Sequence, residues 1–368
     1  MIIWPSMSAR TDDWTFEWRR SWDEVWDAPF VAQWRGVFEA STCVHVYHRP
    51  ELVRQWADTV GATICAEPCV GFATSSNGAK VVLPWVLVPY GGRLTVRRTL
   101  ETAGSAVFGY HSPLVAAEPA TINWGSFWVA AREAVGGACD QALFRLVEPA
   151  LGAGDGMRRD SEESPVLTLA GCTDLDRVLA RCSSSHRVDV KRQFRRVRER
   201  GDVTLKVAGP GDVGWAIDSL RRDLLPAYRS LWKERSIKST MLQPGVDAFL
   251  EGVVTAGVPA GWGHYGALHV GGVPIAWHLG FLDAGRLYWW LPTHDAEWSA
   301  YSPGKLLLAA LIDHGCRAGW QEIHLLTGNH AYKAAWNPSP YQMTAVTWNA
   351  PTLRGRLMTW YDAQSSAK

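Results

Sequence analysis

Hydrophobic and polar positions are most regular in the second half of the chain, between residues 263 and 348. The stretch "GHYGALHVGGVPIAWHLGFLDAGRLYWWLP" contains three apolar runs, separated by Gly271-Gly272 and by Asp283-Ala284-Gly285. Short apolar runs joined by glycine turns predict an antiparallel meander of three strands. The next apolar run, "PGKLLLAALIDHGCRAG", has the length and period of a helix, and "QEIHLLTG" and "YQMTAVTW" have the pattern of strands.

The residues before this meander predict helices around one strand. Residues 172–202 predict one or two helices that end at Gly201, residues 203–209 a strand, and residues 212–257 further helices, the first interrupted at Pro226. The order strand, helices, meander, helix, strand indicates a mixed α/β domain.

The first half of the chain predicts a similar but weaker pattern. Strands are expected on both sides of Gly91-Gly92 and over residues 142–149, with a helix over residues 121–136. Four tryptophans recur at every fourth position, which predicts a helix with an aromatic edge packed onto the protein: Trp14, Trp18, Trp22 and Trp26. Residues 150–165 are rich in glycine and charge and predict a linker. We therefore expect an N-terminal domain over residues 1–160 and a second domain over residues 161–341.

Length and composition limit the classes of function. A chain of 368 residues suits two domains, and a formal net charge of +1 leaves any contact with nucleic acid or membrane to a local patch. The seven cysteines form no Cys-x-x-Cys pair, which indicates reduced thiols in a cytoplasmic protein. Neither a signal peptide nor an apolar run long enough to span a membrane is expected. The histidines show no metal-binding spacing, so no metal is expected.

The tetrad Ser302-Pro303-Gly304-Lys305 stands at the start of the predicted helix. Amides at a helix N-terminus lack intrahelical acceptors and carry partial positive charge, so they can hold a phosphate. Glycine permits a close approach and lysine adds a cation. The alternative is an ordinary helix start with proline at its favoured position. The tetrad is not a P-loop, because Leu306 follows the lysine.

These residues occur within a longer resemblance. The run from Gly272 to Trp336 resembles the GNAT-like family that includes the CelD cellulose-biosynthesis proteins, which are relatives of the FemABX peptidyltransferases. The resemblance lies in "GVPIA", Asp295, "SPG", Gly328, Tyr332-Lys333 and Trp336, and upstream in "SHRVDVKRQFRRVRERG", "YHRPELVRQW" and "GYHSPL". It implies two tandem GNAT-like domains of mixed, largely antiparallel sheets flanked by helices. It also implies a C-terminal tail, residues 342–368, that packs back on the first domain.

The chain departs from this family at the turn that binds acetyl-CoA. GNAT proteins carry Gln/Arg-x-x-Gly-x-Gly/Ala there, whereas this chain has Tyr301 at the first position and Leu306 at the last. A bulkier turn offers fewer close amides to a pyrophosphate. The Fem relatives use aminoacyl-tRNA as donor, so the resemblance leaves both acyl-CoA and aminoacyl-tRNA open, with acyl-CoA favoured.

A basic segment precedes the strand that is predicted over residues 203–209. Between Arg181 and Arg200 there are eight lysines or arginines against two acidic residues. On a helix, four of these cations share one face: Arg187, Lys191, Arg195 and Arg198. This face is a candidate contact for a phosphate or for RNA. The alternative is a solvated amphipathic helix.

Acyl transfer to an amine needs a base, a donor for the developing oxyanion and an acid for the leaving group. The candidates for guiding the proton are His278, His294 and Asp295, and Tyr332 occupies a position where GNAT proteins often place an acid. A buried structural histidine and a helix-capping aspartate are the alternatives. Six residues are candidates for binding donor or acceptor: Tyr288, Trp290, His294, Asn329, Lys333 and Trp336.

Together these patterns predict an N-acyltransferase that acts by direct attack in a ternary complex. The donor-binding residues expected are Ser302, Gly304 and Lys305, and the acceptor expected is the amine of a small molecule. One alternative is a Fem-like transferase that uses aminoacyl-tRNA. The other is a non-catalytic GNAT-fold module in polysaccharide or natural-product assembly. No DNA or membrane partner is expected, and the sequence leaves the acceptor's identity and the oligomeric state open.

Overall fold

The computed structural model describes residues 8–10, 13–42, 44–91, 96–151, 161–233, 239–328, 330–350 and 352–355. The chain divides into two compact units, and each is described by itself below. Unit 1 comprises residues 1–162 and 342–368, and unit 2 comprises residues 163–341. Most of the linker expected over residues 150–165 lies outside the described residues.

Unit 1 is built on a mostly antiparallel sheet with the order β1-β2-β3-β4-β5-β7-β15. Its strands are β1 (Ser8–Arg10), β2 (Trp14–Arg19), β3 (Glu67–Ser75), β4 (Lys80–Tyr90), β5 (Arg97–Thr102), β6 (Leu114–Val115, beside β4), β7 (Gln141–Val147) and β15 (Gln342–Asn349). The α-helices are α1 (Trp22–Val25), α2 (Ala28–Ala40), α3 (Pro50–Trp56) and α4 (Trp124–Val135). β5 and β7 are parallel, because α4 carries the chain between them. β15 runs antiparallel to β7, so residues from the C-terminal end of the chain complete this sheet.

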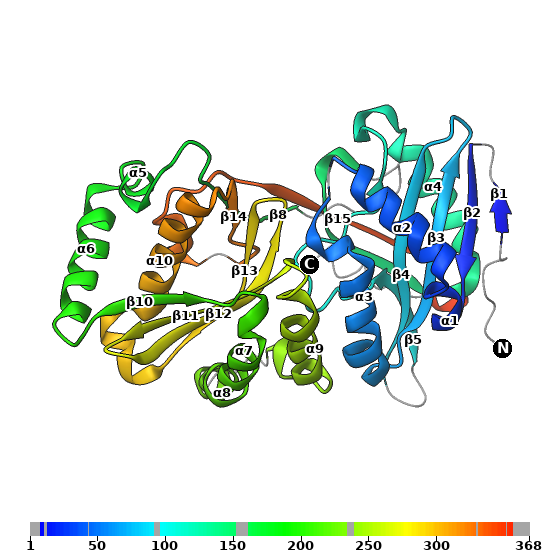
Figure 1. Ribbon diagram of the computed structural model, residues 1–368. Helices are drawn as coiled ribbons and strands as arrows, with labels where there is room; N and C mark the ends of the chain where they lie inside the picture. Colours follow the sequence, from blue (N-terminus) through cyan, green and yellow to red (C-terminus); the bar gives the residue numbers. More distant parts are fainter. Residues whose placement is uncertain are drawn as a thin grey trace, which may run out of the picture. The chain divides into compact units, whose positions relative to one another are not determined.

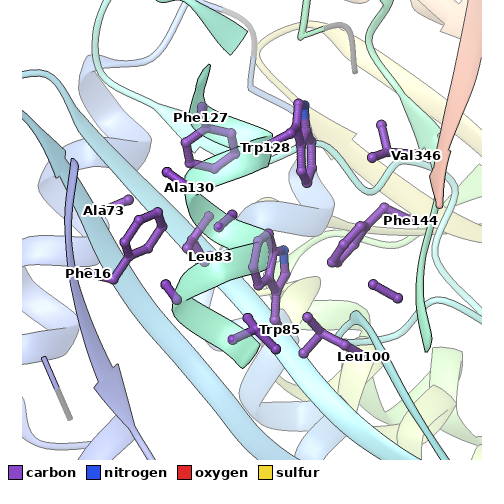
Figure 2. Close-up of a cluster of buried hydrophobic side chains, with 14 of the residues drawn as sticks. Phe16, Ala73, Leu83, Trp85, Leu100, Phe127, Trp128, Ala130, Phe144 and Val346 are labelled. Atoms are coloured by element: carbon purple, nitrogen blue, oxygen red, sulfur yellow. The ribbon is translucent and has the colours of Figure 1, made fainter. Parts of the chain in front are cut away.

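Aromatic side chains fill the core between this sheet and α4. Figure 2 shows Trp128 of α4 beside Trp85 of β4 and Phe144 of β7, and Phe127 of α4 on the side of Phe16 of β2. The Trp85 and Trp128 rings stack with centroids 6.1 Å apart, and Trp85 lies 4.6 Å from Phe144. Aromatic rings bury much apolar area each, so this layer carries a large part of the stability of unit 1.

The predicted tryptophan helix is wrong for its first half. Trp14, Phe16 and Trp18 lie on β2 and are buried on one face, and the helix α1 begins only at Trp22 after the capping residue Ser21. A spacing of four residues keeps side chains on one face of a strand as well as of a helix. Phe16, between the first two tryptophans, fits the strand period of two and not the helix period.

Unit 2 contains a six-stranded sheet among its described residues, with the order β10-β11-β12-β13-β14-β9. The strands are β9 (Val166–Thr168), β10 (Val203–Val207), β11 (Gly263–Val270), β12 (Val273–Asp283), β13 (Arg286–His294) and β14 (Glu322–His324). β8 (Ser161–Glu163) precedes them in the sequence and belongs to the sheet of unit 1, where it lies beside β15 at the edge. The expected meander is β11 to β13, and β14 lies parallel to β13 because α10 (Pro303–Ala318) connects them.

The helices of unit 2 cover both faces of this sheet. α5 (Leu175–Leu179), α6 (Ser184–Arg198) and α10 lie on one face, and α7 (Val213–Ser219), α8 (Leu225–Lys233) and α9 (Val246–Gly252) lie on the other (Figure 1). α11 (Ala331–Ala334) follows β14. The core under α10 is mostly aliphatic and includes Leu306, Leu307, Leu311 and Ile312. The mixed α/β fold class expected from the sequence is therefore confirmed.

The α-helix is interrupted just before Pro226, which is the second residue of α8. A π-helical turn over residues 220–224 joins α7 to α8, and α8 continues through Pro226. Proline cannot donate a backbone hydrogen bond, and a π-turn changes the pattern of bonds just before it.

Candidate functional site

The turn before α10 leaves a helix N-terminus without a side-chain cap. Ser302 has a left-handed backbone with φ of 55°, and its carbonyl accepts from the amides of Lys305 and Leu306 at 3.0 and 3.2 Å. Pro303 has no amide hydrogen, and a Cβ added at Gly304 would meet no atom within 4 Å. The helix therefore starts with open space beside Gly304, where an anion can approach the backbone.

Lys305 is not free at this turn, contrary to the simplest expectation for a phosphate ligand. Its ammonium pairs with Asp189 of α6, which also pairs with Arg192 at 2.5 Å. The hydrogen bond from Lys305 is the largest cause of the lowered pKa of Asp189. Both side chains are about one-quarter exposed. An anion that binds Lys305 therefore has to compete with a carboxylate that is ionised at neutral pH.

The predicted basic helix lies directly beside the turn. Arg196 donates to the carbonyl of Ala300 at 3.0 Å, and Arg200 donates to the hydroxyl of Tyr301 at 3.0 Å. The Arg196 guanidinium also covers the Tyr301 ring at 4.8 Å from its centroid. Tyr301, which replaces the family's Gln or Arg, thus holds the end of α6 against the residues that precede α10.

The four cations named from the sequence differ in their surroundings. Lys191 pairs with Asp176 at 2.9 Å, and Arg187 is half-buried. Arg195 and Arg198 are exposed. Within the part of the chain that the structure describes, neither of these two arginines forms an ion pair, and the Arg198 guanidinium lies over the Phe194 ring at 5.5 Å from its centroid.

The strand before the turn carries a β-bulge and extends past its parallel neighbour. In the pairing of β12 with β13, Leu279 faces Leu291 and Phe281 faces Tyr288, so Trp289 and Trp290 together oppose Gly280. β14 ends at His324, opposite Tyr288, while β13 continues to His294. Bulges occur often next to active sites because they redirect side chains.

Tyr332 lies beside this bulge. Its hydroxyl accepts a hydrogen bond from the indole nitrogen of Trp289 at 3.3 Å, and the side chain is 40% exposed. Burial is the largest cause of the raised pKa of Tyr332, and the bond from Trp289 acts against it. A protonated phenol that reaches solvent can donate a proton to a bound molecule.

His278, the candidate base on β12, belongs to the core. It has no exposed surface, its Nε2 lies 3.3 Å from the amide of Trp290, and its Nδ1 lies 3.1 Å from Nδ1 of His264. Burial lowers its pKa well below the ordinary value. Both ring nitrogens are engaged inside the protein, so the structural interpretation of His278 replaces the catalytic one.

These features were compared with known proteins. A family model for the acetyltransferase (GNAT) domain matches residues 184–334. This part of the chain is a GNAT domain.

Solved structures are similar in fold to more of the chain than residues 184–334. A C-terminal domain from Agrobacterium fabrum, described as that of a lysylphosphatidylglycerol synthetase, is 15% identical with a TM-score of 0.55, over 89% of this chain and 94% of that one. FemX is 8% identical with a TM-score of 0.55, over 86% of this chain and 95% of that one. Both comparisons concern the fold, and they agree with the tandem arrangement implied by the sequence. A search of curated proteins found no match.

The loop between β13 and α10 holds the other two candidates for proton transfer in the GNAT domain. His294 ends β13, is half-buried, and has its Nε2 3.5 Å from the hydroxyl of Ser299. Burial lowers its pKa, so it is neutral at pH 7. Asp295 caps the following short helix, since its Oδ1 accepts from the amide of Glu297 at 3.0 Å. The structure therefore favours the capping interpretation of Asp295, and it leaves His294 as a half-buried histidine at the end of β13.

The aromatic residues expected around an acceptor are mostly core residues. Tyr288 has no exposed surface and stacks on His324 at 5.0 Å, and Trp336 is 1% exposed and packs on His186 at 4.7 Å. Trp290 is half-buried beside Phe281. Tyr288 and Trp336 therefore cannot line a pocket in this conformation, and the two expectations are corrected.

Two candidates after β14 remain. Lys333 is 5% exposed, and its ammonium donates to the carbonyls of Leu326 and Thr327 at 2.9 and 2.7 Å. It therefore holds the loop after β14, which is a structural role. Asn329 lies outside the described residues.

Sequence reasoning missed the residues that act through distant partners. Trp289, Gly280 and Asp189 all contact the candidate site, but each was hidden within an apolar strand or a basic helix. Gly280 offered one signal, because an isolated glycine in a strand pattern indicates a bulge.

Among the described residues, no three His, Cys, Asp or Glu side chains come together as a metal site would require. No described helix is both long and apolar enough to cross a membrane.

Proposed function

We propose that the GNAT domain transfers an acyl group from an acyl-CoA thioester to the amine of a small molecule. The observation that carries this proposal is the uncapped start of α10, with open space beside Gly304 and cations on its own first turn and on the adjoining end of α6. A phosphate-bearing donor is the class of molecule that such a site favours.

Three residues fit the donor's phosphates. The backbone of Gly304 is approachable, Ser302 shapes the turn through its left-handed conformation, and Lys305 supplies a cation. Lys305 exchanges Asp189 for the phosphate when the donor binds. Asp189 retains Arg192, so the carboxylate is not left unpaired after this exchange. The exchange lowers the net gain in affinity, because one ion pair replaces another.

The reaction is a direct attack within a ternary complex. The amine nitrogen attacks the carbonyl carbon of the thioester, the C–N bond forms and the C–S bond breaks. The proton that the amine loses passes to water, because His294 lies about 16 Å along β13 from Trp289, the partner of Tyr332, and cannot reach the same reacting atoms. Tyr332 gives its phenolic proton to the leaving thiolate, because its raised pKa keeps the phenol protonated.

Calorimetry with acetyl-CoA and longer acyl-CoAs tests the donor. We expect micromolar binding by the wild-type protein and at least tenfold weaker binding by Lys305→Ala, since a charge-assisted contact to phosphate is lost. Arg222→Ala is the matched control, because Arg222 is an exposed cation on the other face of the sheet. Absence of binding to any acyl-CoA would exclude this donor.

Aminoacyl-tRNA is the second candidate donor, and the exposed Arg195 and Arg198 favour it. Both side chains are exposed on α6, along which an RNA backbone could run. Filter binding of charged tRNA over a salt series distinguishes the two donors. RNA binding with a steep salt dependence, lost in Arg195→Ala/Arg198→Ala, would favour tRNA.

A further inference from the structure

Behind Tyr332 lies a stack of buried rings that the proposed reaction does not use directly. The Trp289 ring lies parallel to the His278 ring, with centroids 4.7 Å apart and an interplanar angle of 8°. Trp289 is 3% exposed and His278 has no exposed surface. The stack therefore connects Tyr332, a partly exposed residue, to the interior of the sheet.

Hydrogen bonds fix the His278 ring. The Trp290 amide can only donate, and it lies 3.3 Å from Nε2 of His278. Nδ1 of His278 lies 3.1 Å from Nδ1 of His264. The histidine is thus held at both nitrogens, and it presents a fixed face to the indole of Trp289.

The bulge fixes the Trp289 end of the stack. Gly280 permits it, because a Cβ there would lie 2.3 Å from the carbonyl oxygen of Tyr288 and 2.5 Å from the His278 ring. The extra residue in β13 places Trp289 against His278, while its neighbour Trp290 packs on Phe281 and Phe249. In this position the indole N–H of Trp289 points toward the hydroxyl of Tyr332.

We propose that Trp289 is a positioning residue for Tyr332, holding the phenol so that its own proton points to the leaving group of the thioester. The hydroxyl oxygen of Tyr332 accepts from the indole at 3.3 Å, so the O–H bond of the phenol is directed to a different acceptor. The His330 ring stacks on the Tyr332 ring with centroids 5.9 Å apart. This inference rests on the proposed function, in which Tyr332 is the acid.

Trp289→Phe removes the indole donor and keeps a ring against His278. We expect kcat to fall roughly 5- to 10-fold with the KM for the donor unchanged, since one hydrogen bond that orients the acid is lost. The alkaline limb of the pH profile of kcat should move to higher pH, because an N–H donor favours the phenolate and its loss raises the pKa of Tyr332. In the Tyr332→Phe background, the same substitution should have no further effect on kcat.

Trp320→Phe is the matched control. Trp320 is also a buried tryptophan of the GNAT domain, and it packs on His264. The control should lose similar packing without moving the alkaline limb. Absorbance at 295 nm follows the titration of Tyr332 without any substrate, as the difference between each protein and its Tyr332→Phe form. Trp289→Phe should shift that titration upward and Trp320→Phe should not.

The outcomes distinguish a failure of the role proposed for Trp289 from a failure of the proposed acyltransferase function. Transfer activity with a normal alkaline limb and an unchanged Tyr332 titration in Trp289→Phe would overturn the role of Trp289 and leave the acyltransferase intact. A wild-type protein that binds the donor but transfers nothing to any amine would overturn both. A shift of the limb in both tryptophan variants would make the effect one of packing, and would also overturn the positioning role.

Discussion

The two units have the same order of strands and differ where the proposed chemistry lies. Each has an antiparallel run of four strands followed by a helix and a parallel strand: β2, β3, β4, β5, α4 and β7 in unit 1, and β10, β11, β12, β13, α10 and β14 in unit 2. Each sheet then gains an antiparallel neighbour from a distant part of the chain, β15 in unit 1 and β9 in unit 2. One fold thus occurs twice, and the family model matches only the second copy.

The starts of the two connecting helices show the difference. In unit 1, the side chain of Asn123 accepts from the amide of Ser126 at 3.1 Å and so caps α4. In unit 2, Ser302 gives no side-chain cap to α10. A cap satisfies an amide that a ligand would otherwise bind. The amide at the same position of α10 is that of Lys305, and it bonds to the Ser302 carbonyl at 3.0 Å, so the two helix starts differ in what satisfies this amide.

The helix cores differ as well. α4 places Phe127 and Trp128 in an aromatic layer, whereas α10 buries leucines and leaves its first turn polar. The comparison teaches that a shared topology does not make a shared site. The residues at one helix start, and those that pack beside it, decide which copy can bind a donor.

The largest expected effect of a substitution concerns the aromatic core of unit 1. Trp128→Ala should lower the free energy of unfolding by about 3–5 kcal/mol, because a large buried ring leaves a cavity. Donor affinity of the folded protein should remain within about twofold, since the ring does not contact the site. Urea denaturation and calorimetry measure both quantities. A large loss of donor affinity in the folded variant would show that unit 1 takes part in the site.

Acid should destabilise both units through buried histidines. Burial lowers the pKa of His48 in unit 1 and of His264 in unit 2 to about 3. Between pH 6.5 and 3 the unfolded chain binds these protons and the folded chain does not, so stability is lost as pH falls. Each histidine should cost about 2 kcal/mol at pH 5 relative to neutral pH.

Urea denaturation at pH 7.5 and pH 5 checks this prediction. His48→Gln and His264→Gln should each reduce the difference in stability between the two pH values. A difference that is unchanged in both variants would contradict the assigned cause.

Exchanging the helix starts sharpens the comparison of the two units. Ser302→Asp places an anion and a potential cap at the start of α10, and should weaken donor binding about tenfold through repulsion. Asn123→Ala removes the cap of α4, and should cost about 1 kcal/mol of stability without changing donor affinity. Equal donor affinity in the wild type and Ser302→Asp would place the donor elsewhere.

The smallest effect concerns the ion pair of Lys305. Asp189→Asn removes the competing carboxylate, and should strengthen donor binding roughly threefold, because a partly exposed pair contributes little. Calorimetry at low and high salt checks this, and the gain should shrink at high salt. Weaker binding in Asp189→Asn would mean that Asp189 positions Lys305 for the donor instead of competing with it.

The local pattern of apolar and polar residues predicted most helices and strands. It failed where one spacing fits both the helix period and the strand period. The meander β11–β13, the helix α10 and the turn before it follow from glycine turns and a continuous apolar run. Trp14 and Trp18 were assigned to a helix because a spacing of four fits both a helix and a strand. For the candidate site, Ser302 to Lys305 could be named from sequence because a helix start is a local feature.

The sequence by itself determined the order of elements, the open helix start and the basic helix, since these depend on neighbouring residues. Only the tertiary structure decided the partners. Lys305 meets Asp189 across 116 residues, Trp289 meets Tyr332 across 43, and His278 joins His264 in the core. Such pairs depend on how strands and helices pack, because residues far apart in sequence become neighbours only when the sheet and its helices assemble.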